Sequence, residues 1–188
     1  MDFDKVISER KSVRKFHSKK PNWRDIIEAV DAGVRAPLAG AISSVRFILV
    51  DNPEIISKLA TAAQQDFVGE AHYVVVVCSD PTDVIRSYDE RGEIYVRQQA
   101  GAAIENFILK LTDLGLATCW VGDFVDEQVK SALRIPASVF VEAMFPIGYS
   151  LDKSVKKRAP NLDKTLYFNR YKLRFLKPRK EIDSFSEH

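Results

Sequence analysis

The sequence contains few of the residues on which small secreted, fibrous or membrane-spanning proteins depend. Its 188 residues include two cysteines, eight glycines and eight prolines. Cys78 and Cys119 lie in apolar runs and need not pair, so we expect reduced thiols and a cytoplasmic protein. No stretch approaches the ~18 apolar residues of a membrane span, and the first residues lack the apolar core of a secretory signal. We therefore expect no membrane-spanning segment.

Several familiar catalytic and nucleotide-binding motifs are also missing. The chain has no GxGxxG after a predicted strand, no GxxxxGK[S/T] phosphate-binding loop and no GxSxG nucleophile motif. Its three histidines, His17, His72 and His188, are not spaced with cysteines or carboxylates as metal ligands are, so we expect no metal site. If the protein is an enzyme, we expect its reactive group to come from a cofactor.

The charges that are present are placed unevenly. Hydrophobic residues make up 46% of the chain and charged residues 29%, as in one ordinary globular domain, and the formal net charge is only +2. Residues 1–20 carry seven Lys or Arg against three Asp or Glu, residues 21–152 carry ten against nineteen, and residues 153–180 carry eleven against one. This distribution favours nucleic acid, an anionic membrane surface, or a small anion held from both ends of the sequence.

Hydrophobic periodicity predicts helices that alternate with strands. The predicted helices cover 3–10, 23–36, 54–65, 93–115 and 125–135, and the predicted strands cover 45–51, 72–80, 116–124 and 139–149. The run 72–80 is typical of a central strand covered on both faces, and Gly115 stands where a helix-ending glycine is expected. We expect the last strand to break at Pro146 and Gly148. The alternation favours an α/β or α+β architecture in a single domain.

A short basic segment gives the first indication of a binding site. Arg10, Ser12 and Arg14 alternate, so in an extended segment their side chains would offer two guanidinium groups and a hydroxyl to one anion. Phosphate fits this geometry, although a solvated basic turn would have the same composition. A second basic triplet, Lys156-Lys157-Arg158, follows the last predicted strand.

Seven landmarks, in a consistent order from residue 10 to about residue 160, resemble the nitroreductase family of flavin enzymes. They are the RxSxRxF motif at Arg10, Arg35-Ala36-Pro37, AGAAIENFIL from Ala100, the segment from Gly115 to Gly122, Ile135-Pro136, the segment from Pro146 to Tyr149, and KKRAP ending at Pro160. The resemblance implies an α+β fold with a mixed, mainly antiparallel sheet flanked by helices. It also implies an intertwined homodimer that binds FMN at the subunit interface.

The same resemblance implies an activity. FMN would be reduced by NADH or NADPH and would then reduce a small-molecule acceptor, such as a nitroaromatic or a quinone, in the same pocket. Hydride transfer between stacked rings needs positioning and electrostatic tuning from the protein rather than a reactive side chain. We therefore expect no dedicated catalytic residue, because the flavin N5 carries the chemistry.

The resemblance further implies which residues bind FMN. The residues that match the phosphate and ribityl contacts are Arg10, Lys11, Ser12 and Arg14, with Lys156 and Arg158 completing the phosphate clamp. The residues that match the ring contacts are Gln64 at the pyrimidine, with Gln65 as the near alternative, and Trp120, Val121 and Gly122 along the dimethylbenzene and N5 side. Trp120 could instead simply fill the core.

One loop departs from the family pattern. Pro37, Leu38 and Ala39 match a loop that reaches across the dimer to the partner's flavin. After this match, Ala41, Ser43, Ser44 and Val45 stand where the family usually has Asn, Gln, Pro and Trp. FMN is then either held more loosely or bound in a reshaped, more apolar pocket. The change motivates a second hypothesis, a specialised flavin reaction such as dehalogenation or modification of flavin or a metabolite.

The basic C-terminal residues permit a third hypothesis. We expect a flavin-binding domain over 1–160 and a C-terminal extension over 161–188 that packs on this domain or on a partner subunit. Basic residues in 153–180 are interleaved with Tyr167, Tyr171 and Phe175, a composition that could neutralise phosphates and stack bases. No recognised binding module surrounds them, so nucleic-acid binding is the least favoured hypothesis.

Overall fold

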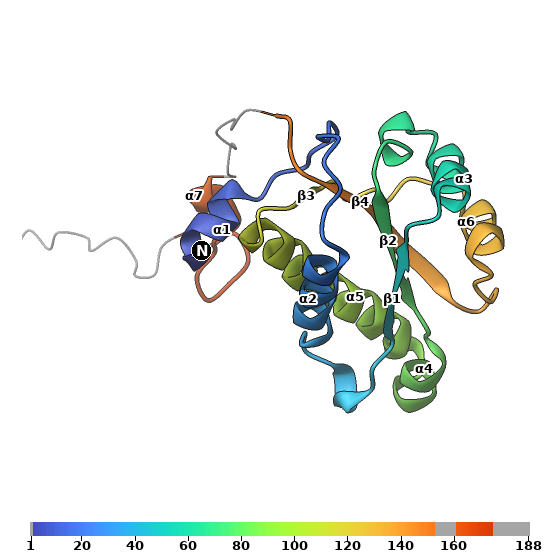
Figure 1. The fold of residues 1–188 in the computed structure, drawn as a ribbon. Helices are drawn as coiled ribbons and strands as arrows, with labels where there is room; N and C mark the ends of the chain where they lie inside the picture. The colour runs from blue at the N-terminus through green and yellow to red at the C-terminus, as the bar shows by residue number, and fades with distance from the viewer. Residues whose placement is uncertain (1, 153–160, 175–188) are drawn as a thin grey trace, which may run out of the picture. The chain divides into compact units, whose positions relative to one another are not determined.

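An antiparallel sheet with helices on both faces organises the first part of the chain (Figure 1). The structure is a computed structural model that describes residues 2–152 and 161–174, and the chain divides into two compact units, Met1–Ser154 and Val155–His188. The strands are β1 (Val45–Val50), β2 (Tyr73–Ser79), β3 (Ala117–Thr118) and β4 (Phe140–Gly148), in the spatial order β1-β2-β4-β3. Each neighbouring pair is antiparallel, so the α+β prediction is confirmed.

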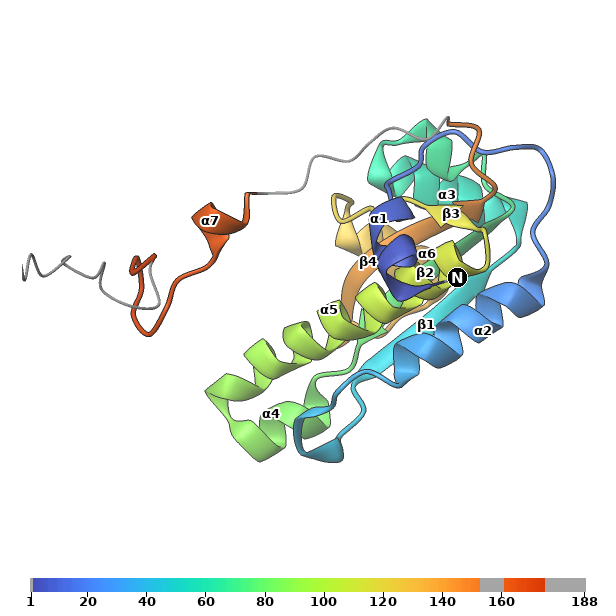
Figure 2. The same cartoon turned by 90° about the vertical axis from the view of Figure 1, so that its left-hand side faces the viewer.

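Two helical layers cover the sheet. On one face lie α2 (Trp23–Val34) and α5 (Glu90–Asp113), and on the other lie α3 (Pro53–Ala63) and α6 (Asp126–Leu133) (Figures 1 and 2). Separate apolar clusters fill the two interfaces, one built around Phe107 and Phe145 and the other around Leu59 and Met144. Every residue of β2 is buried, as the β-branched run predicted for a central strand.

The remaining elements are short. They are α1 (Phe3–Glu9), η1 (Ala39–Ala41), η2 (Asp66–Val68), α4 (Thr82–Tyr88) and, in the second unit, α7 (Leu162–Thr165). The second unit also holds Tyr167 against Tyr171 in an edge-to-face pair, with ring centroids 5.0 Å apart. Among the described residues, none of the helices combines the length and the apolar character needed to cross a bilayer.

The predicted strand 116–124 is wrong beyond its first residues, and the cause is Pro146. Ala117 and Thr118 pair with β4, and Val121 pairs with it again at Met144, so Cys119 lies opposite Pro146 in the same register. An antiparallel pair at this position needs a backbone N–H that proline lacks. The hydroxyl of Thr118 donates to the Pro146 carbonyl instead, at 2.8 Å. The interruption therefore falls in β3, while β4 runs unbroken to Gly148.

Helix α4 was not predicted from the sequence, although Asp80 marks its start. The Asp80 carboxylate accepts hydrogen bonds from the hydroxyl and the backbone N–H of Thr82, at 2.7 and 3.1 Å. These bonds hold the pKa of the Asp80 carboxyl below its ordinary value. The end of α5 matches the prediction, because Gly115 has φ 74° and the N–H of Leu116 donates back to Leu111.

Candidate functional site

The basic N-terminal segment lies between two other parts of the chain. The N–H of Val13 donates to the Thr118 carbonyl of β3 at 2.9 Å. The segment then meets the residues that follow β4, because the N–H of His17 donates to Tyr149 and the N–H of Leu151 donates to Lys15, at 2.8 and 3.1 Å. These backbone bonds fix Arg10 to Arg14 along the end of the sheet.

A pocket of about 330 Å³ opens beside this segment. Its polar rim includes Arg10, Lys11, Ser12, Glu105 of α5 and Ser150, and its apolar wall includes Trp120. Arg10 Nε lies 4.0 Å from a Glu105 carboxylate oxygen. The pocket thus combines a guanidinium, an ammonium and a hydroxyl with an aromatic side chain.

Arg14 lies against a different neighbour. Its guanidinium carbon stands 5.9 Å from the centre of the Phe67 ring in η2, and Arg14 is not among the residues that line the pocket. Gln64 ends α3 with φ 53° and its side chain is exposed, while the side-chain amide of Gln65 donates to the Ala63 carbonyl at 3.4 Å. Phe67, the neighbour of Arg14, was not identified from the sequence.

The Trp120-Val121-Gly122 segment presents both a side chain and open backbone. Trp120 is 44% exposed and its ring packs edge-on against Phe145, with centroids 5.6 Å apart, so it does not simply fill the core. Val121 is buried and exchanges two backbone hydrogen bonds with Met144. A Cβ built on Gly122 would meet nothing nearer than Trp120 at 3.6 Å. A planar ligand can therefore approach the backbone at Gly122.

The Pro37-Leu38-Ala39 loop lies elsewhere. The turn η1, light blue between α2 and β1, stands at the opposite end of α5 from α1 and β3 (Figures 1 and 2). Gly40 and Ala41 both have positive φ, and a Cβ on Gly40 would meet the Tyr88 hydroxyl at 2.4 Å. Within this single chain, the loop and the pocket are not brought together.

Lys156 and Arg158 lie outside the described residues. The chain that precedes them is nevertheless held beside the first basic segment, because Lys11 Nζ donates to the Asp152 carbonyl at 3.0 Å. Phe16 and Ser150 form an antiparallel bridge in the same region. The first basic segment thus lies beside residues 150–152, at the end of the described part of the first unit.

The donors at the pocket suit a phosphate-bearing cofactor. Positively charged donors and a hydroxyl are the groups that bind phosphate oxygens, and Trp120 offers an aromatic surface to a ring.

Burial raises the pKa of the Cys78 thiol to about 11, so this cysteine is not a nucleophile at neutral pH. In the part of the chain that the structure describes, His, Cys, Asp and Glu form no cluster that could hold a metal ion.

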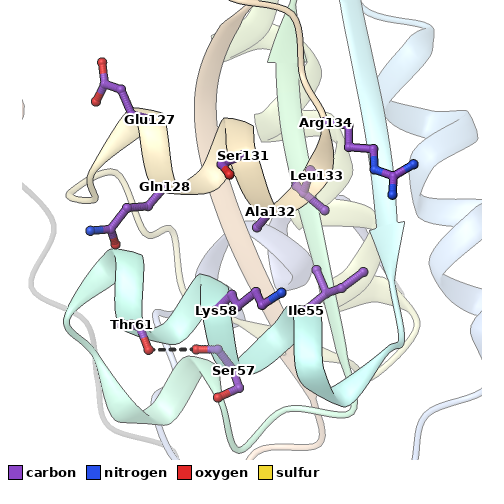
Figure 3. Close-up of a pocket in the computed structure, with 10 residues that line it drawn as sticks. All are labelled: Ile55, Ser57, Lys58, Thr61, Glu127, Gln128, Ser131, Ala132, Leu133 and Arg134. Carbon is purple, nitrogen blue, oxygen red and sulfur yellow. Dashed lines mark hydrogen bonds between the residues drawn. The ribbon is translucent and has the colours of Figure 1, made fainter.

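A larger cavity, of about 870 Å³, lies between α3 and α6 (Figure 3). Lys58 and Ile55 of α3 face Ser131 and Ala132 of α6 across it, and Arg134 stands at one end (Figure 3). None of the site residues predicted from the sequence lines this cavity. We therefore place the candidate site at the smaller pocket.

Comparison with known proteins agrees with the fold. Residues 7–67 and 60–149 match the nitroreductase family. A protein of Archaeoglobus fulgidus named "Putative NADH dehydrogenase/NAD(P)H nitroreductase" is 30% identical over 79% of this chain and 86% of its own length. The crystal structure of a nitroreductase family protein from Clostridium novyi NT has a TM-score of 0.75 at 27% identity, covering 95% of this chain and 99% of that one. The Vibrio harveyi NADPH:FMN oxidoreductase complexed with NAD+ has a TM-score of 0.79 at 21% identity, covering 91% and 78%.

Proposed function

Because the chain belongs to the nitroreductase family, whose members are FMN-dependent NAD(P)H oxidoreductases, we propose that it binds FMN and passes hydride from NADH or NADPH to a small-molecule acceptor such as a nitroaromatic or a quinone. The observation that carries the proposal is the pocket in which Arg10, Lys11 and Ser12 lie beside the exposed ring of Trp120. When bound, FMN supplies the hydride chemistry that no side chain of the pocket provides.

The basic residues hold the phosphate. Arg10 and Lys11 offer charge-assisted donors and Ser12 offers a hydroxyl. From the family pattern, Lys156 and Arg158, which lie outside the described residues, would complete the phosphate clamp. Arg14 comes from the same extended segment, on the side of Phe67 and Gln64. Gln64 supplies an amide to the pyrimidine edge of the ring.

The aromatic wall orients the ring. Trp120 shields one part of the pocket from water, and the backbone at Val121 and Gly122 is open to close approach. The bonds between Val121 and Met144 hold this backbone in place, so a donor or acceptor on it is already positioned before the ligand arrives. The NAD(P)H and the acceptor would use the exposed face of the ring in turn.

A second copy of the chain would complete the site. The Pro37-Leu38-Ala39 loop lies too far along α5 to serve the pocket of its own protomer, and this supports its placement at the partner's flavin. Trp23, Ile27 and Val34 form an exposed apolar stripe on α2, beside the stripe of buried residues that includes Ile26 and Ala29. An intertwined homodimer would cover this stripe. We also propose that residues 161–188 form an extension whose role is to pack on the domain or on the partner.

The absorption spectrum of the purified protein tests the cofactor. We expect visible flavin bands, or their appearance on reconstitution with FMN, and bleaching when NADH or NADPH is added without oxygen. Protein that stays colourless and unreactive after added FMN would contradict the proposal.

Turnover with acceptors tests the reaction. We expect NAD(P)H oxidation to continue when a simple quinone or nitroaromatic is supplied. A protein that bleaches but does not turn over with these acceptors would favour the specialised reaction suggested by the altered residues Ala41 to Val45.

A further inference from the structure

Helix α5 contributes a carboxylate to the pocket beside the basic N-terminal segment. Glu105, Ile108 and Thr112 all line this pocket, and their spacing of three and seven positions places them on one face of the helix. Ile108 is buried and forms apolar wall, whereas the Glu105 side chain is 51% exposed. The family resemblance assigned no role to Glu105.

Other polar groups of the pocket are already bound within the chain. The Thr112 hydroxyl donates to a carbonyl of its own helix at 2.9 Å, and the Ser150 hydroxyl donates to the Asp152 carbonyl at 3.3 Å. Glu9, the second carboxylate that lines the pocket, lies 3.7 Å from the Lys5 ammonium, one turn earlier in α1. These groups therefore have local partners.

Three side chains of the pocket differ in this respect. Among the hydrogen bonds between described residues, none uses the Arg10 guanidinium, the Ser12 hydroxyl or the Glu105 carboxylate. Arg10 Nε and the Glu105 carboxylate are 4.0 Å apart, beyond hydrogen-bond distance, so this half-exposed ion pair is weak. A carboxylate accepts hydrogen bonds, donates none and repels a phosphate. A ligand that suits all three groups therefore carries an anion for Arg10 and separate hydroxyl or amine donors for Glu105.

We propose that Glu105 is a cofactor-binding residue whose carboxylate accepts hydrogen bonds from the hydroxyl groups of the ribityl chain of FMN. This inference rests on the proposed function, because it names a further contact in the same pocket. In FMN a chain of hydroxyl groups leads to the phosphate, which matches an acceptor placed beside cationic donors. Hydrogen bonds to a charged acceptor are stronger than those between neutral groups. The same carboxylate disfavours a ligand that brings a phosphate without hydroxyls.

An FMN analogue with a phosphopentyl chain in place of the phosphoribityl chain isolates this role, because it keeps the ring and the phosphate and lacks the hydroxyls. We expect the wild type to bind FMN about tenfold more tightly than the analogue. Glu105→Ala should raise the Kd for FMN about tenfold, and should leave the Kd for the analogue unchanged or lower because the repulsion of the phosphate is removed. Quenching of flavin fluorescence on the apoprotein measures each Kd.

Two further variants control for charge and for general effects. Glu105→Gln keeps a carbonyl that can accept a hydrogen bond, so we expect it to retain part of the preference for FMN over the analogue. Glu93→Ala is the matched control, because Glu93 is an exposed glutamate of the same helix that does not line the pocket. It should leave both constants unchanged.

The outcomes separate the inference from the proposed function. Wild-type protein that binds neither ligand would overturn the proposed function and the inference with it. Wild-type protein that binds both equally well, or a Glu105→Ala variant that keeps the full preference for FMN, would overturn only the inference, because a contact between Glu105 and the hydroxyls must appear as coupling between the two deletions. Equal losses for both ligands would also overturn it, because they would indicate that Glu105 acts through Arg10.

Discussion

At the scale of single residues, Arg10 and Arg14 belong to one extended segment yet have different neighbours. Arg10 lines the pocket beside Glu105, and Arg14 lies over Phe67. Alternation along a strand predicts that residues two and four apart lie on the same side. It does not predict which other side chains they contact there. Glu105 and Phe67 come from α5 and η2, and neither carries a local signal that the sequence could have supplied. The residue types of the site were predictable, and their neighbours were not.

Replacing Arg14 with alanine should weaken FMN binding. A phosphate that loses one charge-assisted hydrogen bond loses roughly 1.5–3 kcal/mol, about 10- to 150-fold in Kd. Lys58→Ala is the control, because it removes an exposed cation from the cavity between α3 and α6. Titration of the apoprotein with FMN measures both. Equal FMN affinity in wild type and Arg14→Ala would refute the phosphate role of this arginine.

At the scale of elements, most helices and strands were predictable, including the seven-residue α1, whereas the length of β3 and the helix α4 were not. The central strand, the helix that ends before Gly115 and the paired outer helices follow from apolar patterns of seven or more residues. The length of β3 could not be predicted from a local apolar pattern. It depends on the pairing of β3 with β4, where Pro146, about thirty residues further along the chain, interrupts the hydrogen bonds. Helix α4 was missed although it is as long as α1, and its signal lies in Asp80 and Pro81 before its first residue.

The burial of strand β2 should be visible in the pH dependence of stability. Burial raises the pKa of the Cys78 thiol from an ordinary value of 9.0 to about 11, and the Glu142 carboxylate adds to the rise. The native state therefore keeps the proton to higher pH than the unfolded state. The stabilisation is complete below about pH 9 and is lost as the pH rises through about 11, by about 3 kcal/mol at most.

Urea unfolding at pH 8 and at pH 10.5 measures this loss. The decrease in the free energy of unfolding between the two values should be smaller in Cys78→Ala than in wild type, since tyrosines and lysines titrate equally in both. Identical decreases would show that the thiol does not contribute.

At the scale of the whole molecule, the site residues lie at two ends of one protomer. The pocket lies near α1 and β3, and the Pro37-Leu38-Ala39 loop lies at the far end of α5 (Figure 2). In the sequence, only the family resemblance indicated that this loop and the pocket would be apart. The spacing of residues along the chain does not predict that a loop serves the site of another subunit. The exposed stripe on α2 is the independent physical reason to expect a second copy.

A charge in this stripe should separate the protomers. Ile27 is 46% exposed, and Ile27→Glu would place a carboxylate where the partner is proposed to pack, so we expect a monomer that retains little FMN. Val125→Glu, at an exposed apolar residue before α6, is the control and should remain dimeric. Sedimentation velocity measures both states. A dimeric Ile27→Glu variant, or a monomeric wild type that holds FMN, would contradict the proposed assembly.

The pairing of the N-terminal segment with the residues after β4 also has a consequence for the order of folding. Lys11 and Asp152, which meet there, are 141 residues apart in the sequence. Contacts between such distant residues close a very long loop, which costs entropy and slows folding. A nascent chain cannot form this pairing until β4 and the residues after it have been synthesised. The cofactor would therefore bind late in folding, after the sheet has formed. Its binding would stabilise the pairing between the N-terminal segment and the residues after β4 by mass action.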